Sequence, residues 1–187
     1  MSTIHYWLNS TLCLPTVGKR ATIQKQEALC KLPTLHKAAK NGDKAMLINL
    51  ISKGSNIHQP CHQGYSLLHH ACSNGQVECV QYLIQSGSQI DATASGGITP
   101  LHKAIYAGCL ESVKHLLTSG ANVNKTDCTG HTPLHGAARF GYLQIVSTLL
   151  NHGANLDAKD DYGYTPLDEA IKYKQRKTII FLLDLLS

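Results

Sequence analysis

Large aromatic side chains are scarce in this sequence. Trp occurs once and Phe twice among 187 residues, so an apolar core must be built mainly from Leu, Ile, Val and Ala. No apolar run approaches the roughly 18 residues that cross a bilayer. The weakly apolar stretch 4–17 is not preceded by a basic residue, which is untypical of a secretory signal. These absences favour a helical protein over a membrane-spanning or secreted one.

Paired cysteines are also lacking. The seven cysteines form an odd set without a CxxC pair, which argues against both a disulfide framework and a four-cysteine zinc site. A reducing compartment is therefore expected. We predict a cytoplasmic location, with the nucleus as the alternative.

Motifs of catalysis are missing as well, since the sequence contains no GxSxG, P-loop, HExxH or GxGxxG pattern. One mixed group has residue types that bind zinc: Cys61, His62, His69, His70 and Cys72. We expect its first two members on a turn and Cys72 packed in a helix, too far apart for one ion. The sequence thus predicts no enzyme activity, no cofactor and no metal.

The main feature of the sequence is a regular spacing of 33 residues, which is typical of repeat proteins. It joins five leucines, five alanines, two sets of four glycines and five further leucines. These are Leu35, Leu68, Leu101, Leu134 and Leu167; Ala38, Ala71, Ala104, Ala137 and Ala170; Gly54, Gly87, Gly120 and Gly153; Gly64, Gly97, Gly130 and Gly163; and Leu50, Leu83, Leu116, Leu149 and Leu182.

Each period predicts two short helices and a turn. In the third period, Thr99-Pro100 starts a helix, because Pro fits the first helical position, and this helix runs to about Ala107. Gly108 allows the chain to reverse into a second amphipathic helix, which Gly120 ends in the left-handed conformation. The polar segment after it is typical of a long turn or β-hairpin. Such short helices depend on their neighbours, so the stack is the unit of folding.

These residues resemble the ankyrin repeat. The segments 99–104 (TPLHKA) and 132–137 (TPLHGA) match its TPLHxA signature, and 116–124 (LLTSGANVN) is similar to its close. The resemblance implies an all-α solenoid of five repeats, about 33–65, 66–98, 99–131, 132–164 and 165–187. It also implies that the His of the signature forms a hydrogen bond between repeats. The fifth repeat departs, with Asp168 in place of that His and Lys174 in place of Gly, as expected of a terminal repeat.

Positive charge is concentrated before the repeats and in the first of them. Residues 1–53 carry eight Lys or Arg against two acids. We expect residues 1–30 to form a basic, poorly ordered leader and 31–187 to form the repeat domain. A basic surface can attract nucleic acid or anionic lipid. That is the alternative function, through Lys19, Arg20, Lys25, Lys31, Lys37 and Lys40.

The resemblance also implies a protein partner, bound across hairpin tips and the concave face of the first helices. When the family's partner-contacting positions are transferred to this sequence by their place in the repeat, they hold many aromatic and basic residues. Such residues are common interface anchors. The predicted contact residues are Tyr65, His70, Lys103, Tyr106, His131, Arg139, Phe140, Tyr162, Tyr164 and Tyr173, with Tyr106, Arg139 and Phe140 at the centre. The competing interpretation is that each Tyr packs on its neighbouring hairpin. We predict a small adaptor, scaffold or inhibitor.

Two further features carry predictions. Residues 179–186 are apolar on more than one face, which predicts self-association or a docked partner at the last helix. Asn124 occupies the position that, in similar repeats, is hydroxylated by the asparaginyl hydroxylase of the oxygen-sensing pathway.

Overall fold

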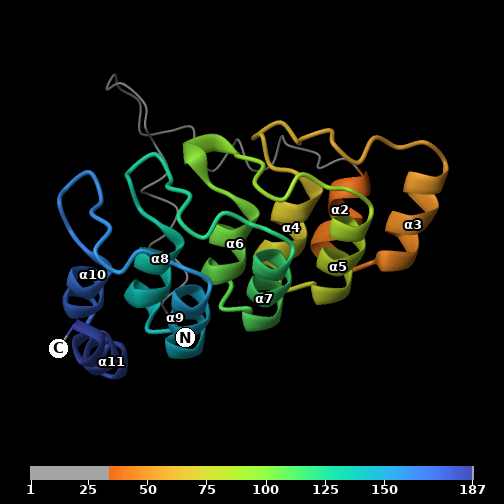
Figure 1. The fold of residues 1–187 in the computed structure, drawn as a ribbon. Coiled ribbons are helices and arrows are strands. Elements are labelled where there is room, and N and C mark those ends of the chain that lie inside the picture. Colours follow the sequence, from red (N-terminus) through yellow and green to blue (C-terminus); the bar gives the residue numbers. More distant parts are fainter. Residues whose placement is uncertain (1–33, 187) are drawn as a thin grey trace, which may run out of the picture.

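The structure is a computed structural model that describes residues 34–186. Its helices form two layers along one elongated stack (Figure 1). The first helix of each repeat lies in one layer: α2 (Thr34–Asn41), α4 (Leu67–Ser73), α6 (Pro100–Tyr106), α8 (Pro133–Phe140) and α10 (Pro166–Lys172). The second helices form the other: α3 (Lys44–Ser52), α5 (Val77–Gln85), α7 (Leu110–Thr118), α9 (Leu143–Asn151) and α11 (Arg176–Leu186). The predicted helical solenoid is confirmed, whereas the leader predicted for residues 1–30 lies outside the described residues.

The repeating leucines and alanines form the core between the layers. Leu68, Leu101 and Leu134 are fully buried, and so is Ala104 with most of its equivalents. The small alanine side chains let neighbouring helices approach closely, while each buried leucine contributes about 1.5–3 kcal/mol. The 33-residue spacing is therefore the spacing of core contacts between consecutive helix pairs.

Four first helices begin with the same hydrogen-bonded cap. In α6, the Thr99 hydroxyl accepts from the backbone N–H of His102, and His102 Nδ1 accepts from the backbone N–H of Thr99. Such a capping box satisfies two amides that a helix start leaves unbonded. In α10, Asp168 Oδ2 takes over the role of the imidazole, at 2.8 Å from the Thr165 nitrogen. The departure in the fifth repeat therefore keeps the cap.

The same histidines bind each first helix to the end of the turn that leads into the next first helix. Because Nδ1 accepts a backbone N–H, the neutral ring carries its proton on Nε2, which donates to a carbonyl 29 residues further on. The Nε2 to oxygen distances are 3.0 Å from His69 to Ile98, 3.4 Å from His102 to His131 and 3.0 Å from His135 to Tyr164. With repeats at 66–98, 99–131 and 132–164, each of these carbonyls belongs to the last residue of the same repeat, so the bond predicted between repeats reaches the boundary with the next repeat without crossing it. Burial is the main reason why the pKa values of His69 and His102 are lowered to about 4.

The connecting segments 53–66, 86–99, 119–132 and 152–165 are turns. In each, two short-range backbone bonds close the tip, such as Ala94 N–H to Ile98 O at 2.9 Å and Gly97 N–H to Ala94 O at 3.0 Å. The described residues contain no strand, so these tips are tight turns and not the paired strands of a β-hairpin. One connection includes a short 3₁₀ turn, η1 (Ser95–Gly97). In the described part of the chain, no helix has the length and apolar character of a membrane crossing.

Candidate functional site

Most of the predicted contact residues lie along one band over the first helices and the ends of the connecting turns. We call this band the first-helix surface. It consists of Tyr65, His70, Lys103, Tyr106, Arg139, Phe140, Tyr164, Lys172 and Tyr173. Ring and cation contacts connect neighbouring members of this band.

At the N-terminal side, Lys103 of α6 reaches back to Tyr65, at the end of the turn that precedes α4. Its Nζ lies 4.6 Å from the centre of the Tyr65 ring, a cation–π contact. Tyr65 in turn meets His70 edge-on at 5.9 Å between ring centres, and His70 meets His36 at 5.4 Å. Burial, together with the neighbouring His36 and other cationic groups, lowers the pKa of His70 to about 4. Burial also lowers the pKa of Lys103.

Tyr106 and Phe140, two of the three residues predicted at the centre of the partner contact, pack against each other. Tyr106 on α6 and Phe140 on α8 contact edge to face, with ring centres 6.2 Å apart. Gly136 makes room for this arrangement, because a Cβ on it would lie 3.1 Å from Cε1 of Tyr106. Burial raises the pKa of Tyr106. Part of each ring is thus used in packing between repeats and part remains accessible, since both residues are partly exposed.

At the C-terminal side, two cations surround one buried carboxylate. Glu169 on α10 is 1% exposed, with Arg139 Nη1 at 3.8 Å from its Oε2 and Lys172 Nζ at 3.5 Å from its Oε1. Arg139 also lies 4.2 Å from the centre of the Tyr173 ring, and Lys172 lies 5.0 Å from that of Tyr164. Because two cations share one carboxylate, this end of the band keeps a positive charge.

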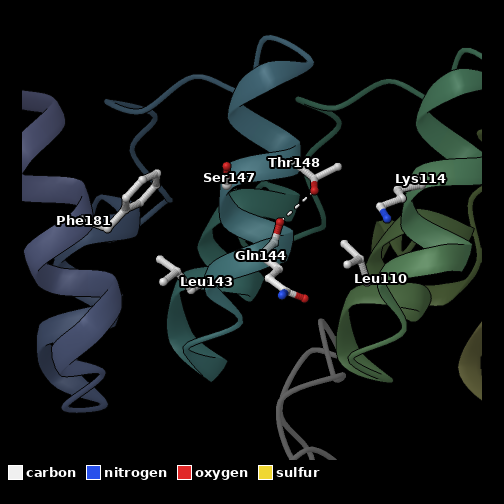
Figure 2. Close-up of a pocket in the computed structure, with 7 residues that line it drawn as sticks. All are labelled: Leu110, Lys114, Leu143, Gln144, Ser147, Thr148 and Phe181. Atoms are coloured by element: carbon white, nitrogen blue, oxygen red, sulfur yellow. Dashed lines mark hydrogen bonds between the residues drawn. The ribbon is translucent and has the colours of Figure 1, made fainter.

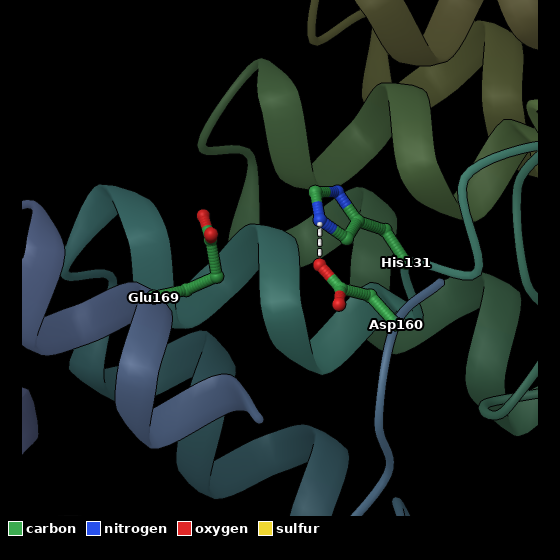
Figure 3. Close-up of side chains that lie close together, drawn as sticks. All are labelled: His131, Asp160 and Glu169. Carbon is green, nitrogen blue, oxygen red and sulfur yellow. Dashed lines mark hydrogen bonds and ion pairs between the residues drawn. The ribbon is translucent and has the colours of Figure 1, made fainter. Parts of the chain in front are cut away.

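His131 was predicted as a contact residue for a partner, but its ring is hydrogen-bonded to the next repeat. Its Nε2 lies 2.9 Å from Oδ2 of Asp160, which is itself buried (Figure 3). Asp160 Oδ1 accepts the backbone N–H groups of Tyr162 and Tyr164. Burial alone would raise the pKa of Asp160, but these amides and His131 hold it below its usual value. The pair fixes the last connecting turn.

His131, Asp160 and Glu169 bring three possible metal ligands within 4.8 Å of one another. Asp160 has three hydrogen bonds, and Glu169 lies beside two cations, although its buried Oε2 has no hydrogen-bond partner. A divalent ion would also be repelled by Arg139 and Lys172. The donor set therefore does not suit a metal. Among the described residues, no three members of the predicted Cys61 to Cys72 group bring their ligand atoms together.

The remaining candidate positions differ in exposure. Tyr162 projects from the last connecting turn and is 76% exposed. Asn124 is exposed, yet its amide bridges to the fourth connection: Nδ2 donates to Gly153 O at 2.9 Å, and Oδ1 accepts from Asn155 N at 2.8 Å.

A pocket lies on the second-helix layer, away from the first-helix surface. It is an open hollow of about 500 Å³ between α7, α9 and α11, lined by Leu110, Lys114, Leu143, Gln144, Ser147, Thr148 and Phe181 (Figure 2). Its lining offers hydroxyl groups and one amine but no imidazole, thiol or carboxylate. It therefore lacks a general base beside either hydroxyl group.

The last helix keeps an apolar face exposed, as its sequence predicted. Leu182 is buried against α9 and α10, while Ile180 is 61% and Leu183 49% exposed. Leu185 and Leu186 are also about half exposed.

Three important residues of this region were not found from the sequence: Glu169, Asp160 and Gly136. Gly136 and Glu169 occupy the same position in their repeats as Lys103 does in its own. Asp160 lies 29 residues after His131, the same separation as in the hydrogen bonds of His69, His102 and His135. Tabulating these registers would have pointed to them, but not to their contacts.

Comparison with known protein families gives one match. The model described as ankyrin repeats (3 copies) matches residues 35–127 and 108–186. A comparison with curated proteins found no match.

Proposed function

The chain belongs to the ankyrin repeat family, whose repeats are in general non-catalytic protein–protein interaction modules, and on that premise we propose that it acts as a small adaptor, scaffold or inhibitor. It binds its protein partner across the first-helix surface and the adjoining turn tips. The supporting observation is the band itself, in which Tyr, Phe and Arg side chains from successive repeats are held partly exposed by ring and cation contacts. Such residues combine a large contact area with a polar group.

Cys72 and Cys79 are buried free thiols, and burial raises the pKa of each. Unreactive, unpaired thiols fit a reducing compartment. We therefore place the proposed activity in the cytoplasm or the nucleus.

The test compares partner capture by the wild type and by the triple variant Tyr106→Ala, Arg139→Ala and Phe140→Ala. A matched control, Lys114→Ala, Gln144→Ala and Thr148→Ala, removes three side chains from the second-helix layer. Circular dichroism first establishes that both variants fold. Partners captured by the wild type are identified by mass spectrometry, and their affinities are then measured by calorimetry.

We expect the triple variant to lose the partner by at least about tenfold in affinity, as removal of two or three interface anchors does. The control variant should bind like the wild type. An unchanged affinity of the folded triple variant would contradict the proposal.

The alternative, binding of nucleic acid or anionic lipid through basic residues, rests on the charge of residues 1–53. Lys37 and Lys40 are exposed on α2, and Lys19, Arg20, Lys25 and Lys31 lie outside the described residues. Such binding weakens steeply as salt rises. A titration against an oligonucleotide and against phosphatidylserine vesicles at two salt concentrations separates this alternative from a protein interface.

A further inference from the structure

The positive charge of the described chain is carried by the first helices. They hold five basic side chains and two carboxylates, whereas the other described residues hold eight basic and nine acidic ones. The basic five are Lys37, Lys40, Lys103, Arg139 and Lys172. Of the two carboxylates, Asp168 caps its helix and Glu169 is buried. The surface available to a ligand is therefore cationic.

Aromatic rings hold three of these cations in place. Lys103 lies over Tyr65, Arg139 over Tyr173 and Lys172 over Tyr164, at 4.2–5.0 Å from the ring centres. A ring attracts a cation but carries no net charge, so it orients Lys103 without neutralising it. Arg139 and Lys172 also lie beside Glu169, so these two cations together keep one positive charge. In the described part of the chain, Lys103 forms no ion pair with a carboxylate. These groups are thus arranged in advance for a negatively charged ligand, which lowers the entropy lost on binding.

We propose that the first-helix surface binds an extended acidic peptide segment of the partner, with carboxylates about six residues apart and an apolar side chain between them. This inference rests on the proposed function and names the chemistry of its partner. One carboxylate lies at Lys103 and the other at the Arg139 and Lys172 pair. The apolar side chain lies on Tyr106 and Phe140, which stand between those two ends.

The length follows from the geometry of the stack. Neighbouring packed helices are about 8–10 Å apart, so α6 and α10 are separated by roughly 16–20 Å. An extended chain advances about 3.3 Å per residue, and five or six residues therefore cover this distance. A helical ligand would need roughly twice as many residues, at 1.5 Å each.

A nucleic acid suits this surface less well. Its backbone carries one negative charge on every nucleotide, and those charges would pass the carboxylates of the neighbouring turns. Asp127 and Asp161 lie on these turns, and Glu169 lies between the two cations at the C-terminal end. Separate carboxylates on a peptide can meet the cations and avoid the acids.

The probe is a fluorescein-labelled nine-residue peptide with two acidic residues at each end, Leu at the centre, and Gly and Ser between. A second peptide has Gln in place of the acidic residues. Fluorescence anisotropy measures both against the wild type, the first-helix pair Lys103→Gln and Lys172→Gln, and a control pair of equal charge, Lys114→Gln and Lys177→Gln. A twelve-nucleotide single-stranded RNA is titrated in parallel.

We expect the acidic peptide to bind about tenfold more tightly than the Gln peptide, and the first-helix pair to weaken it by about five- to tenfold. The control pair should have no effect. Equal binding of the two peptides, equal effects of the two variant pairs, or tighter binding of the RNA would each overturn the inference. A captured partner that is lost with Tyr106→Ala, Arg139→Ala and Phe140→Ala but unaffected by the first-helix pair would leave the proposed function standing and refute the acidic segment.

Discussion

The guanidinium carbon of Arg139 on α8 lies 4.2 Å from the centre of the Tyr173 ring on α10. The same side chain is only 18% exposed and places Nη1 at 3.8 Å from the buried carboxylate of Glu169. Arg139 thus contacts an aromatic ring and an acid of the following repeat at once. It contributes to the stack as well as to the first-helix surface.

Replacing Arg139 by Met should lower the free energy of unfolding by about 1–3 kcal/mol, because Glu169 then loses a cationic neighbour while remaining buried. Adding Glu169→Gln should recover part of this loss, since the uncompensated charge disappears. Urea unfolding of the single and double variants measures both effects. A double variant no more stable than Arg139→Met would show that the carboxylate is not the source of the cost.

Stability should fall as the pH drops from about 6.5 to about 4. The folded pKa values of His69 and His102 are about 4, below the unfolded value of 6.5. The unfolded chain therefore takes up these protons first, and each pKa unit corresponds to about 1.4 kcal/mol. The stabilisation is complete above pH 6.5 and is lost through this window. Urea midpoints across the window measure it.

His102→Gln should make that pH dependence shallower, because Gln can accept the Thr99 N–H in a capping box but does not titrate. His58→Gln, at an exposed position in a connecting turn, is the matched control and should leave the slope unchanged. Equal slopes for His102→Gln and the wild type would contradict the assignment of this effect to the buried imidazole.

Lys174→Gly should stabilise the chain by about 0.5–1 kcal/mol. Lys174 has a φ of 57°, where its four equivalents in the other repeats are glycines with φ of 64–78°. A side chain is disfavoured in this left-handed region, and the gain exceeds the greater entropy of Gly in the unfolded chain. Lys177→Gly, within α11, is the control and should cost about 1 kcal/mol. Thermal unfolding that shows destabilisation by both changes would refute the argument.

Hydroxylation of Asn124 stays a prediction from the family resemblance. The residue is exposed, but its amide hydrogen bonds to Gly153 and Asn155 hold it against the next repeat. Modification would therefore require this turn to open locally, which costs less than global unfolding. In protein purified from oxygenated eukaryotic cells, we expect the peptide containing Asn124 to gain the mass of one oxygen atom. An unmodified peptide would rule the modification out under those conditions.

Self-association through α11 follows from its exposed apolar side chains. We expect the wild type to show a mass that rises with concentration in light scattering. Replacing Ile180 and Leu183 by Lys should restore a monomer, because charges on this face cannot be buried against a second copy. Ile48→Lys, on the exposed side of α3 at the other end of the stack, is the control. A wild type that is monomeric at every concentration would contradict the prediction.

The sequence by itself determined the helix pairs and their limits. Thr99 and Pro100 start α6 through contacts within the first turn, and the observed helix ends at Tyr106, one residue from the predicted end. Glycines such as Gly120, with a φ of 91°, end the second helices as expected. These features depend on neighbours within a few residues along the chain. They repeat with the period of the sequence, so they can be predicted from it.

Only the tertiary structure decided which side chains meet across repeats. Lys103 and Tyr65 are 38 residues apart, and His131 and Asp160 are 29 apart. Sequence reasoning placed His131 at a partner's surface, whereas its ring is paired with the buried Asp160. Packing between helices decides which rotamer of Tyr106 lies over Gly136 and which cations reach Glu169. Neither helix alone determines these contacts. The repeat is a local property of this chain, while its candidate binding surface arises from contacts between repeats.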